Sequence, residues 1–312
     1  MSENICAPNK YDAENKTCFT LEQLIEMCSA YNRYLIKNKL SPQINHSGPN
    51  NLNNPNDLIK IKPDKKYLLI ELKKRFDRVC HGDEICITKQ SFMNEIVNEM
   101  REEFDHYTFR SKGPDNPIEW LSTADINSVL MQYERIYPDF KFLGAVPLDC
   151  VRLPFCSLYQ IDFKQYLDHG IKQLGIILNL DKFGQPGSHW VSLYINLGSG
   201  EIYFCDSNGK PPPDFIKQTI NQFQKFYQSK TGKQVIYKYN KIAYQEDQSE
   251  CGIYSCNFII RKLSGETFDD IVKNYLGFKE INSCRNVYFR NKPSKYKSHF
   301  SCDPHNSRGS RY

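Results

Sequence analysis

The stretch around Cys251 has the composition of a reactive thiol site. Cys251 and Gly252 open a run with apolar residues at helical spacing, namely Ile253, Tyr254, Phe258, Ile259 and Leu263. The polar residues 245–250 before it predict a loop that leads into this helix. A helix N-terminus and a nearby imidazolium both favour a thiolate, and they lower a cysteine pKa from about 8.5 to roughly 3.5–7.5. We therefore predict that Cys251 is a nucleophile for attack on a carbonyl group.

The predicted base for this thiol is His189. It follows a turn-rich segment and begins residues 189–197, in which apolar side chains alternate with others as in a β-strand. The next apolar run, 201–205, follows a Gly-containing turn and ends at Asp206, so the two runs are expected to pair as a hairpin. Asp206 would then hold the imidazole in the tautomer that leaves Nε2 free for Cys251, and would stabilise the imidazolium.

Taken together, these residues resemble the SUMO-specific (ubiquitin-like-protein-specific) cysteine proteases and the adenovirus protease. The resemblance rests on four features in chain order: His189-Trp190, Asp206 after the next strand, Gln245, and Cys251-Gly252 six residues later at the start of a helix. The order His, Asp, Cys is that of this family and differs from the papain order of Cys, His, Asn. Segments 204–213 and 248–254 look most like the virion-maturation proteases of large DNA viruses.

The resemblance implies a role for each of these residues. Cys251 would be the nucleophile, His189 the general base and acid, and Asp206 the residue that orients the ring. The side-chain amide of Gln245 would donate to the oxyanion beside the backbone N–H of Cys251. Gln248 is the competing candidate for this oxyanion role.

Three further residues bear on the substrate. Trp190 would roof a narrow channel that admits glycine-like residues before the scissile bond, and Gly252 would leave room for the substrate carbonyl. Glu250 stands where cellular SUMO proteases usually carry Asp. This departure leaves the catalytic set intact but argues against SUMO itself as the substrate.

These observations give a functional hypothesis and two alternatives. The hypothesis is a cysteine endopeptidase that cleaves after small, Gly-type residues, at Gly-Gly-X or Gly-X sites, and processes viral structural precursors during virion maturation. One alternative is an isopeptidase that removes SUMO or ubiquitin. The other is an inactive structural or nucleic-acid-binding virion protein that keeps the fold. The thiol chemistry requires no metal or other cofactor.

The composition fits a globular protein, with 40% hydrophobic and 13% aromatic residues in 312. The first twenty residues contain three acidic side chains and lack the apolar core of a secretion signal. No run reaches the ~18 apolar residues of a membrane span. We therefore expect no membrane partner and a location in the virion or the host cytoplasm.

The twelve cysteines are dispersed and lack the spacing of a disulfide framework. We expect free thiols in a reducing compartment, where a catalytic thiolate stays reduced. Cys6 with Cys18, and Cys80 with Cys86, lack the C-x-x-C pairs of structural zinc sites, so no metal site is predicted.

The predicted elements indicate an α+β fold: a SUMO-protease and adenovirus-protease type of core, with a central mixed sheet flanked by helices, plus an N-terminal, mostly helical extension. A capping box at Thr20–Gln23 predicts the first helix, and helices are expected near 65–78 and 91–104. The predicted segments are 1–40, an N-terminal helical segment; 41–56, a flexible linker; 57–112, a helical accessory region; 113–283, the catalytic domain; and 284–312, a basic C-terminal tail.

The tail from Arg285 to Tyr312 contains seven Lys or Arg residues and one acidic residue, Asp303. Five of these cations are candidates for contacts with nucleic-acid phosphates: Arg285, Arg290, Lys292, Lys295 and Lys297. A solvated tail without a partner is the alternative.

Overall fold

The computed structural model describes four stretches of the chain: residues 5–40, 58–116, 118–292 and 294–304. The chain divides into two compact units, Met1–Phe109 and Arg110–Tyr312, and each is described by itself. The predicted linker 41–56 lies outside the described residues. Among the helices of the described stretches, none has the length and apolar character needed to cross a membrane.

The N-terminal unit is helical. Its elements are α1 (Leu21–Leu40), α2 (Lys65–Cys80), α3 (Glu84–Ile87), a 3₁₀ turn η3 (Ser91–Glu95), α4 (Asn98–Glu102) and a π-helical turn η4 (Glu103–Tyr107). The predicted capping box precedes α1: the Thr20 N–H donates to Gln23 Oε1 (2.9 Å) and the Gln23 N–H donates to Thr20 Oγ1 (3.2 Å). Within this unit, the predicted N-terminal helical segment and the predicted accessory region contribute to one hydrophobic core, which includes Leu24, Met27, Leu68, Leu72 and Phe92.

The predicted single helix near 91–104 is wrong. The chain instead forms η3, an extended pair of residues and then α4. Ile96 and Val97 adopt extended backbone angles, with ψ of 138° and 148°, and adjacent β-branched residues favour this conformation. The break exposes Val97, whereas Phe92 and Ile96 are buried.

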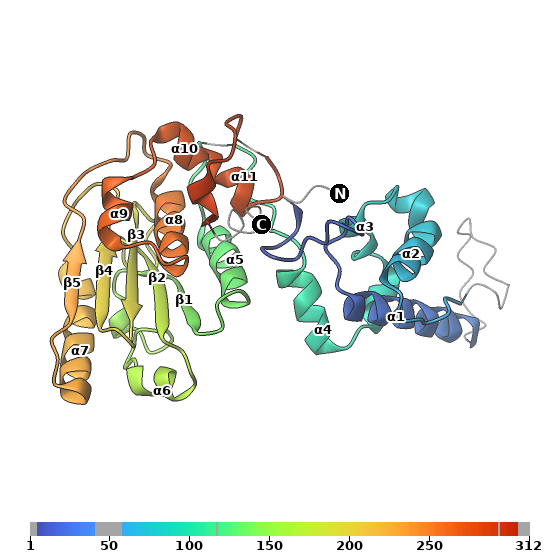
Figure 1. The fold of residues 1–312 in the computed structure, drawn as a ribbon, viewed down its shortest axis with the longest axis horizontal. Helices are drawn as coiled ribbons and strands as arrows, with labels where there is room; N and C mark the ends of the chain where they lie inside the picture. Colours follow the sequence, from blue (N-terminus) through green and yellow to red (C-terminus); the bar gives the residue numbers. More distant parts are fainter. Residues whose placement is uncertain (1–4, 41–57, 117, 293, 305–312) are drawn as a thin grey trace. The chain divides into compact units, whose positions relative to one another are not determined.

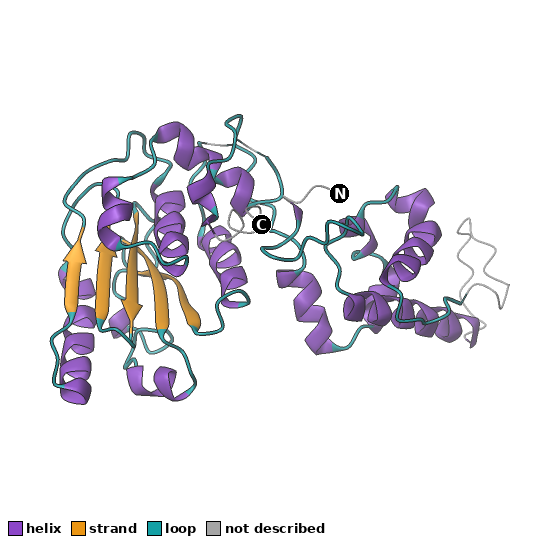
Figure 2. Ribbon diagram, viewed as in Figure 1, coloured by secondary structure: helices purple, strands orange, loops and turns teal. Residues whose placement is uncertain are grey.

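The C-terminal unit is built on a five-stranded mixed sheet (Figure 2). Its strands lie side by side in chain order: β1 (Phe140–Pro147), β2 (Gln173–Asn179), β3 (Trp190–Asn196), β4 (Glu201–Cys205) and β5 (Ile236–Tyr239). Neighbours among β2, β3 and β4 are antiparallel, whereas β1 and β5 run parallel to the strands they adjoin. The predicted mixed sheet and the helical extension are both confirmed.

Helices cover both faces of this sheet (Figure 1). One face packs against α5 (Thr123–Glu134) and α8 (Cys251–Leu263), and the other against α6 (Phe163–Asp168) and α7 (Asp214–Thr231). Both faces of β3 are buried because its side chains alternate between the two cores. Tyr194 shares a core with Phe258 of α8, whereas Leu193 shares a core with Phe223 of α7.

The last described segment packs against α8. It contains α9 (Phe268–Lys273), α10 (Phe278–Ser283), α11 (Arg285–Tyr288) and a 3₁₀ turn η6 (Phe300–Cys302). Asn257 of α8 donates from Nδ2 to the Ser301 carbonyl (2.8 Å). The Cys284–Cys302 disulfide cross-links the residue between α10 and α11 to the last residue of η6. The helix that begins at Cys251 is therefore held from both sides, by the sheet and by this last described segment.

The described parts of the predicted basic tail, 284–292 and 294–304, are folded. Arg285 is fully buried, so its predicted contact with nucleic acid is wrong: the guanidinium cannot reach a phosphate. Arg290 donates from Nη1 to the Arg110 carbonyl (3.0 Å). The exposed candidates are Lys292, Lys295 and Lys297.

Six cysteines form three disulfides, so the expectation of twelve free thiols is wrong. The pairs are Cys6–Cys18, Cys80–Cys86 and Cys284–Cys302. The spacing of these cysteines in the sequence follows no framework pattern. The fold brings the paired Cα atoms to 5.2, 5.4 and 5.0 Å, within the range that a disulfide spans. Six cysteines remain free, and Cys251 is one of them.

The three disulfides predict a count of alkylated thiols. After denaturation without reductant, the protein should take up six carbamidomethyl groups, one for each free cysteine, and twelve after reduction. Intact-mass spectrometry after iodoacetamide treatment gives both numbers. Twelve groups without reductant would contradict the cross-links.

Candidate active site

Pairing of β3 with β4 brings the predicted base and its partner together. Ser192 of β3 lies opposite Cys205 of β4 in an antiparallel pair, so residues before β3 lie beside residues after β4. His189 Nε2 and Asp206 Oδ1 are 2.7 Å apart. Asp206 is only 1% exposed, and a buried carboxylate requires hydrogen-bond partners of this kind.

Asn240, after β5, fixes the backbone of Asp206. The Asp206 N–H donates to Asn240 Oδ1 (2.8 Å), and Asn240 Nδ2 donates to the Asp206 carbonyl (2.6 Å). Asp206 Oδ1 also accepts the backbone N–H of Asn208 (2.8 Å). The sequence analysis missed Asn240, because a single Asn after a short strand carries no motif or period that marks it.

The His189 ring is turned relative to the prediction. Nε2 bonds to Asp206, so Nδ1 is the nitrogen left for Cys251, whereas the sequence analysis had assigned Nε2 to the thiol. Burial of the ring opposes its protonation, but hydrogen bonds to Asp206 and Cys251 outweigh burial. They raise the pKa of His189 from its ordinary 6.5 to about 9. The ring is therefore an imidazolium at neutral pH, as a thiolate–imidazolium pair requires.

Cys251 is the first residue of α8 and is buried. Glu250, the N-cap residue, makes no side-chain hydrogen bond to the first turn, so this turn keeps its N–H groups free of a side-chain cap. The positive end of the helix dipole also lies at the thiol. This arrangement suits nucleophilic attack with an oxyanion at the helix N-terminus. The described residues contain no group of three or more His, Cys, Asp or Glu side chains that could hold a metal ion.

Gly252 allows a close approach between α8 and Leu121. A Cβ atom at Gly252 would lie 3.0 Å from Leu121 Cβ and 3.2 Å from its Cγ, so the direction of a side chain here is filled by protein and not by substrate. The Leu121 carbonyl accepts a hydrogen bond from Trp190 Nε1 (2.9 Å). Leu121 therefore connects the helix that carries Cys251 to the indole beside His189.

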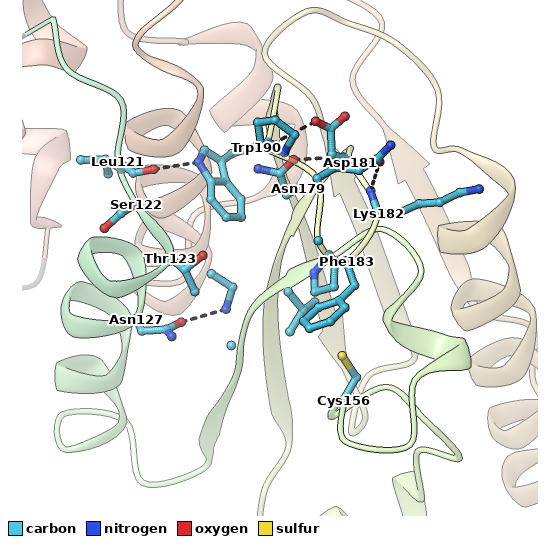
Figure 3. Close-up of a pocket in the computed structure, with 18 of the residues that line it drawn as sticks. Leu121, Ser122, Thr123, Asn127, Cys156, Asn179, Asp181, Lys182, Phe183 and Trp190 are labelled. Atoms are coloured by element: carbon cyan, nitrogen blue, oxygen red, sulfur yellow. Dashed lines mark hydrogen bonds between the residues drawn. The ribbon is translucent and has the colours of Figure 1, made fainter.

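Trp190 and Leu121 line a cavity of about 820 Å³ (Figure 3). The loop that precedes His189 contributes Phe183, whose ring lies 5.1 Å from that of Phe155 in an edge-to-face contact. This volume is within the range of ligand sites, and the cavity starts one residue from the base. The sequence analysis identified Trp190 but missed the other aromatic residues that line the cavity: Trp120, Phe155 and Phe183.

Gln245 is anchored to the segment that carries Asp206. The Gln245 N–H donates to the Ser207 carbonyl (3.2 Å), and Gln245 Oε1 accepts from Ser207 Oγ (2.5 Å). Gln245 Nε2 donates one of its two hydrogens to the Asp247 carbonyl (2.5 Å). Gln248, the competing oxyanion donor, is exposed.

Comparisons with known proteins agree with this fold. Residues 171–298 match the model of the Ulp1 protease family, C-terminal catalytic domain. The chain is 56% identical over 305 residues to protein R355 of Acanthamoeba polyphaga mimivirus, whose name classes it among the thiol proteases; 97% of this chain and 99% of that protein are covered. It is 22% identical over 250 residues to the SUMO-1 cysteine protease of African swine fever virus, with 73% and 90% covered.

A solved structure has the same fold. The crystal structure of the African swine fever virus protease has a TM-score of 0.59 at 17% identity, with 93% of this chain and 97% of that chain covered. The fold and the relatives together define a cysteine peptidase. The chain belongs to the Ulp1 protease family, which confirms the resemblance to SUMO proteases and to proteases of large DNA viruses.

Replacing Asp206 by Asn should lower the pKa of His189. Asn keeps the shape of the side chain but removes the negative charge that favours the imidazolium. If the imidazolium protonates the leaving amine, the alkaline limb of kcat/KM follows the pKa of His189, which is about 9 in the wild type, and should move to lower pH in this variant. A pH–rate profile measures this shift, and Asp214→Asn at an exposed aspartate is the control. An unchanged limb in Asp206→Asn would remove Asp206 from the catalytic set.

Gln245→Ala should lower kcat by about 10²-fold if its amide binds the oxyanion. Gln248→Ala, three residues along the same loop, should stay near wild type because this side chain is exposed. Steady-state kinetics on one peptide substrate compares the two variants. A larger loss from Gln248→Ala would transfer the oxyanion role to Gln248.

Proposed function

We propose that this protein is a cysteine endopeptidase with a Cys251, His189 and Asp206 triad, which cleaves after small, Gly-type residues. We further propose that its substrates are structural precursor proteins that are processed during virion maturation. The observation that carries the proposal is the position of His189, which bonds to Asp206 through Nε2 (2.7 Å) and whose pKa is raised by the neighbouring Cys251, the first residue of α8.

The proposed reaction passes through an acyl-enzyme. The Cys251 thiolate attacks the substrate carbonyl, and the oxyanion is bound by the Cys251 N–H and by Gln245 Nε2. His189 gives its Nδ1 proton to the leaving amine, which departs and leaves a thioester. The neutral ring then takes a proton from water, and the hydroxide attacks the thioester to release the acid and restore the thiolate–imidazolium pair.

The preference for small residues is proposed from the surroundings of Trp190. Its indole is 6% exposed and is fixed by the hydrogen bond to the Leu121 carbonyl, so it cannot swing aside without losing that bond. A fixed indole next to the base leaves space for a flat, glycine-like backbone but not for a large side chain. The cavity beyond it has room for further substrate residues.

The proposed role in virion maturation is supported by the viral relatives, one of which is similar over 97% of this chain. An isopeptidase that removes a ubiquitin-like modifier is the second candidate, because another relative is named as a SUMO-1 cysteine protease. In the predicted basic tail, the candidates for contacts with nucleic acid are the exposed Lys292, Lys295 and Lys297.

Cys251→Ala should abolish cleavage and probe labelling without unfolding the protein. Cys256→Ala, a buried cysteine on the same helix, should keep both and serves as the matched control. The measurement is mass spectrometry after exposure to a ubiquitin-like propargylamide and, separately, to a Gly-Gly peptide aldehyde. Capture of the short peptide alone supports precursor processing, whereas labelling by the modifier supports the isopeptidase. Turnover by Cys251→Ala would contradict the proposed nucleophile.

A further inference from the structure

Two buried charges lie next to the nucleophile and have no part in the mechanism above. Arg285 of α11 and Glu250, the residue before Cys251, are both fully buried. Burying an ion costs several kcal/mol unless well-placed partners offset that cost. Charges in such a position therefore require directed contacts, and the structure contains them.

Asn282 of α10 joins the two charges. Arg285 Nε donates to Asn282 Oδ1 (3.2 Å), and Asn282 Nδ2 donates to Glu250 Oε1 (3.3 Å). Ser249 makes a second link: its carbonyl accepts from Arg285 Nη2 (3.1 Å), and its hydroxyl donates to Glu250 Oε1 (2.7 Å). The two residues that lead into Cys251 are thus held by α10 and α11.

Arg285 also acts on the nucleophile through its charge. Burial lowers the pKa of Arg285, and the negative charges of Glu250, Cys251, Asp125 and Glu119 oppose this change. Among the described residues, Arg285 Nη1 and Glu250 Oε2 have no hydrogen-bond partner. One nitrogen of the guanidinium thus has no hydrogen-bond partner among the described residues. The positive charge of the guanidinium favours an anion at Cys251.

We propose that Arg285 is a positioning residue for the nucleophile. It holds the Ser249–Glu250 backbone so that Cys251 begins α8 with its thiol toward His189, and its charge stabilises the thiolate. The network also draws the Glu250 carboxylate away from the first turn of α8, which leaves the N–H groups there for the oxyanion. This inference rests on the proposed function, in which Cys251 is the nucleophile.

The first test is Arg285→Lys. Lysine keeps the charge, but a single ammonium cannot replace a planar fork that binds both Asn282 Oδ1 and the Ser249 carbonyl. We expect kcat for a fluorogenic Gly-Gly peptide amide to fall by about 10²-fold, since a 1 Å displacement of a reacting group has this effect, while KM changes little. The matched control is Arg261→Lys, which disturbs another buried arginine and its ion pair with Glu266. Arg261 lies ten residues along α8 from Cys251, about 15 Å away.

The second test is the pH dependence of Cys251 alkylation by iodoacetamide in Arg285→Met. The charged groups that interact with Cys251 are His189 before β3 and Arg285 in α11. These two cations in turn interact with other acidic groups: His189 with Asp206 after β4, and Arg285 with Glu250 at the start of α8, Asp125 in α5 and Glu119. Removing the Arg285 charge should move the alkylation midpoint to higher pH, whereas Arg285→Lys should leave it near wild type. The double variant Glu250→Gln/Arg285→Met leaves no unpaired buried charge; it should fold, and its kcat should remain low because the hydrogen bonds to residue 249 are absent.

The outcomes separate this inference from the proposed function. If the wild-type protein is not alkylated at Cys251 and does not cleave the peptide, the proposed function fails and this inference fails with it. If the wild-type protein reacts but folded Arg285→Lys retains wild-type kcat, or loses no more than Arg261→Lys, the positioning role is overturned and the triad stands. The positioning role of Arg285 would also be overturned if the folded double variant Glu250→Gln/Arg285→Met had the wild-type kcat.

Discussion

The hydrogen bond between His189 and Asp206 exists only in one register of β3 against β4, the one in which Ser192 lies opposite Cys205. A slip of one residue would turn every side chain of β3 to the opposite face of the sheet. Such a slip is opposed by two cores at once, because Tyr194 packs toward α8 and Leu193 toward α7. Burial of both faces of β3 thus fixes the distance between the His189 ring and the Asp206 carboxylate.

The position of the proposed nucleophile depends on a second constraint, the burial of α8. Every residue from Cys251 to Leu263 is buried, with the sheet on one side and the C-terminal segment on the other. Cys251 can therefore reach substrate only at the helix N-terminus, where the N–H groups and the dipole favour an anion. The contacts of α10 and α11 to Ser249 and Glu250 fix where that terminus lies. In the proposed positioning role of Arg285, α10 and α11 are part of the site, although they contribute no reacting atom.

The sequence predicted those features that have a local pattern. The alternation in 189–197 identified β3, the helical spacing after Cys251 identified α8, and the mixed sheet followed from the element order. The His189 ring orientation, the disulfides and the burial of Arg285 were not predictable in this way. Each depends on contacts between segments far apart in the chain, such as Arg285 with Ser249, and an arginine in a Lys- and Arg-rich segment has the sequence pattern of a solvent-exposed cation. Asn240 escaped notice for the same reason.

In the proposed mechanism, His189 is an imidazolium paired with the Cys251 thiolate. The most direct measurement is an NMR pH titration of the protein with ¹³C-labelled histidine, followed at the His189 Cε1–H and compared with Cys251→Ala. We predict a His189 pKa near 9 in the wild type and a lower pKa in Cys251→Ala, because the thiolate that favours the imidazolium is gone. A wild-type pKa near the ordinary 6.5, unchanged in Cys251→Ala, would contradict the pair and with it the proposed triad.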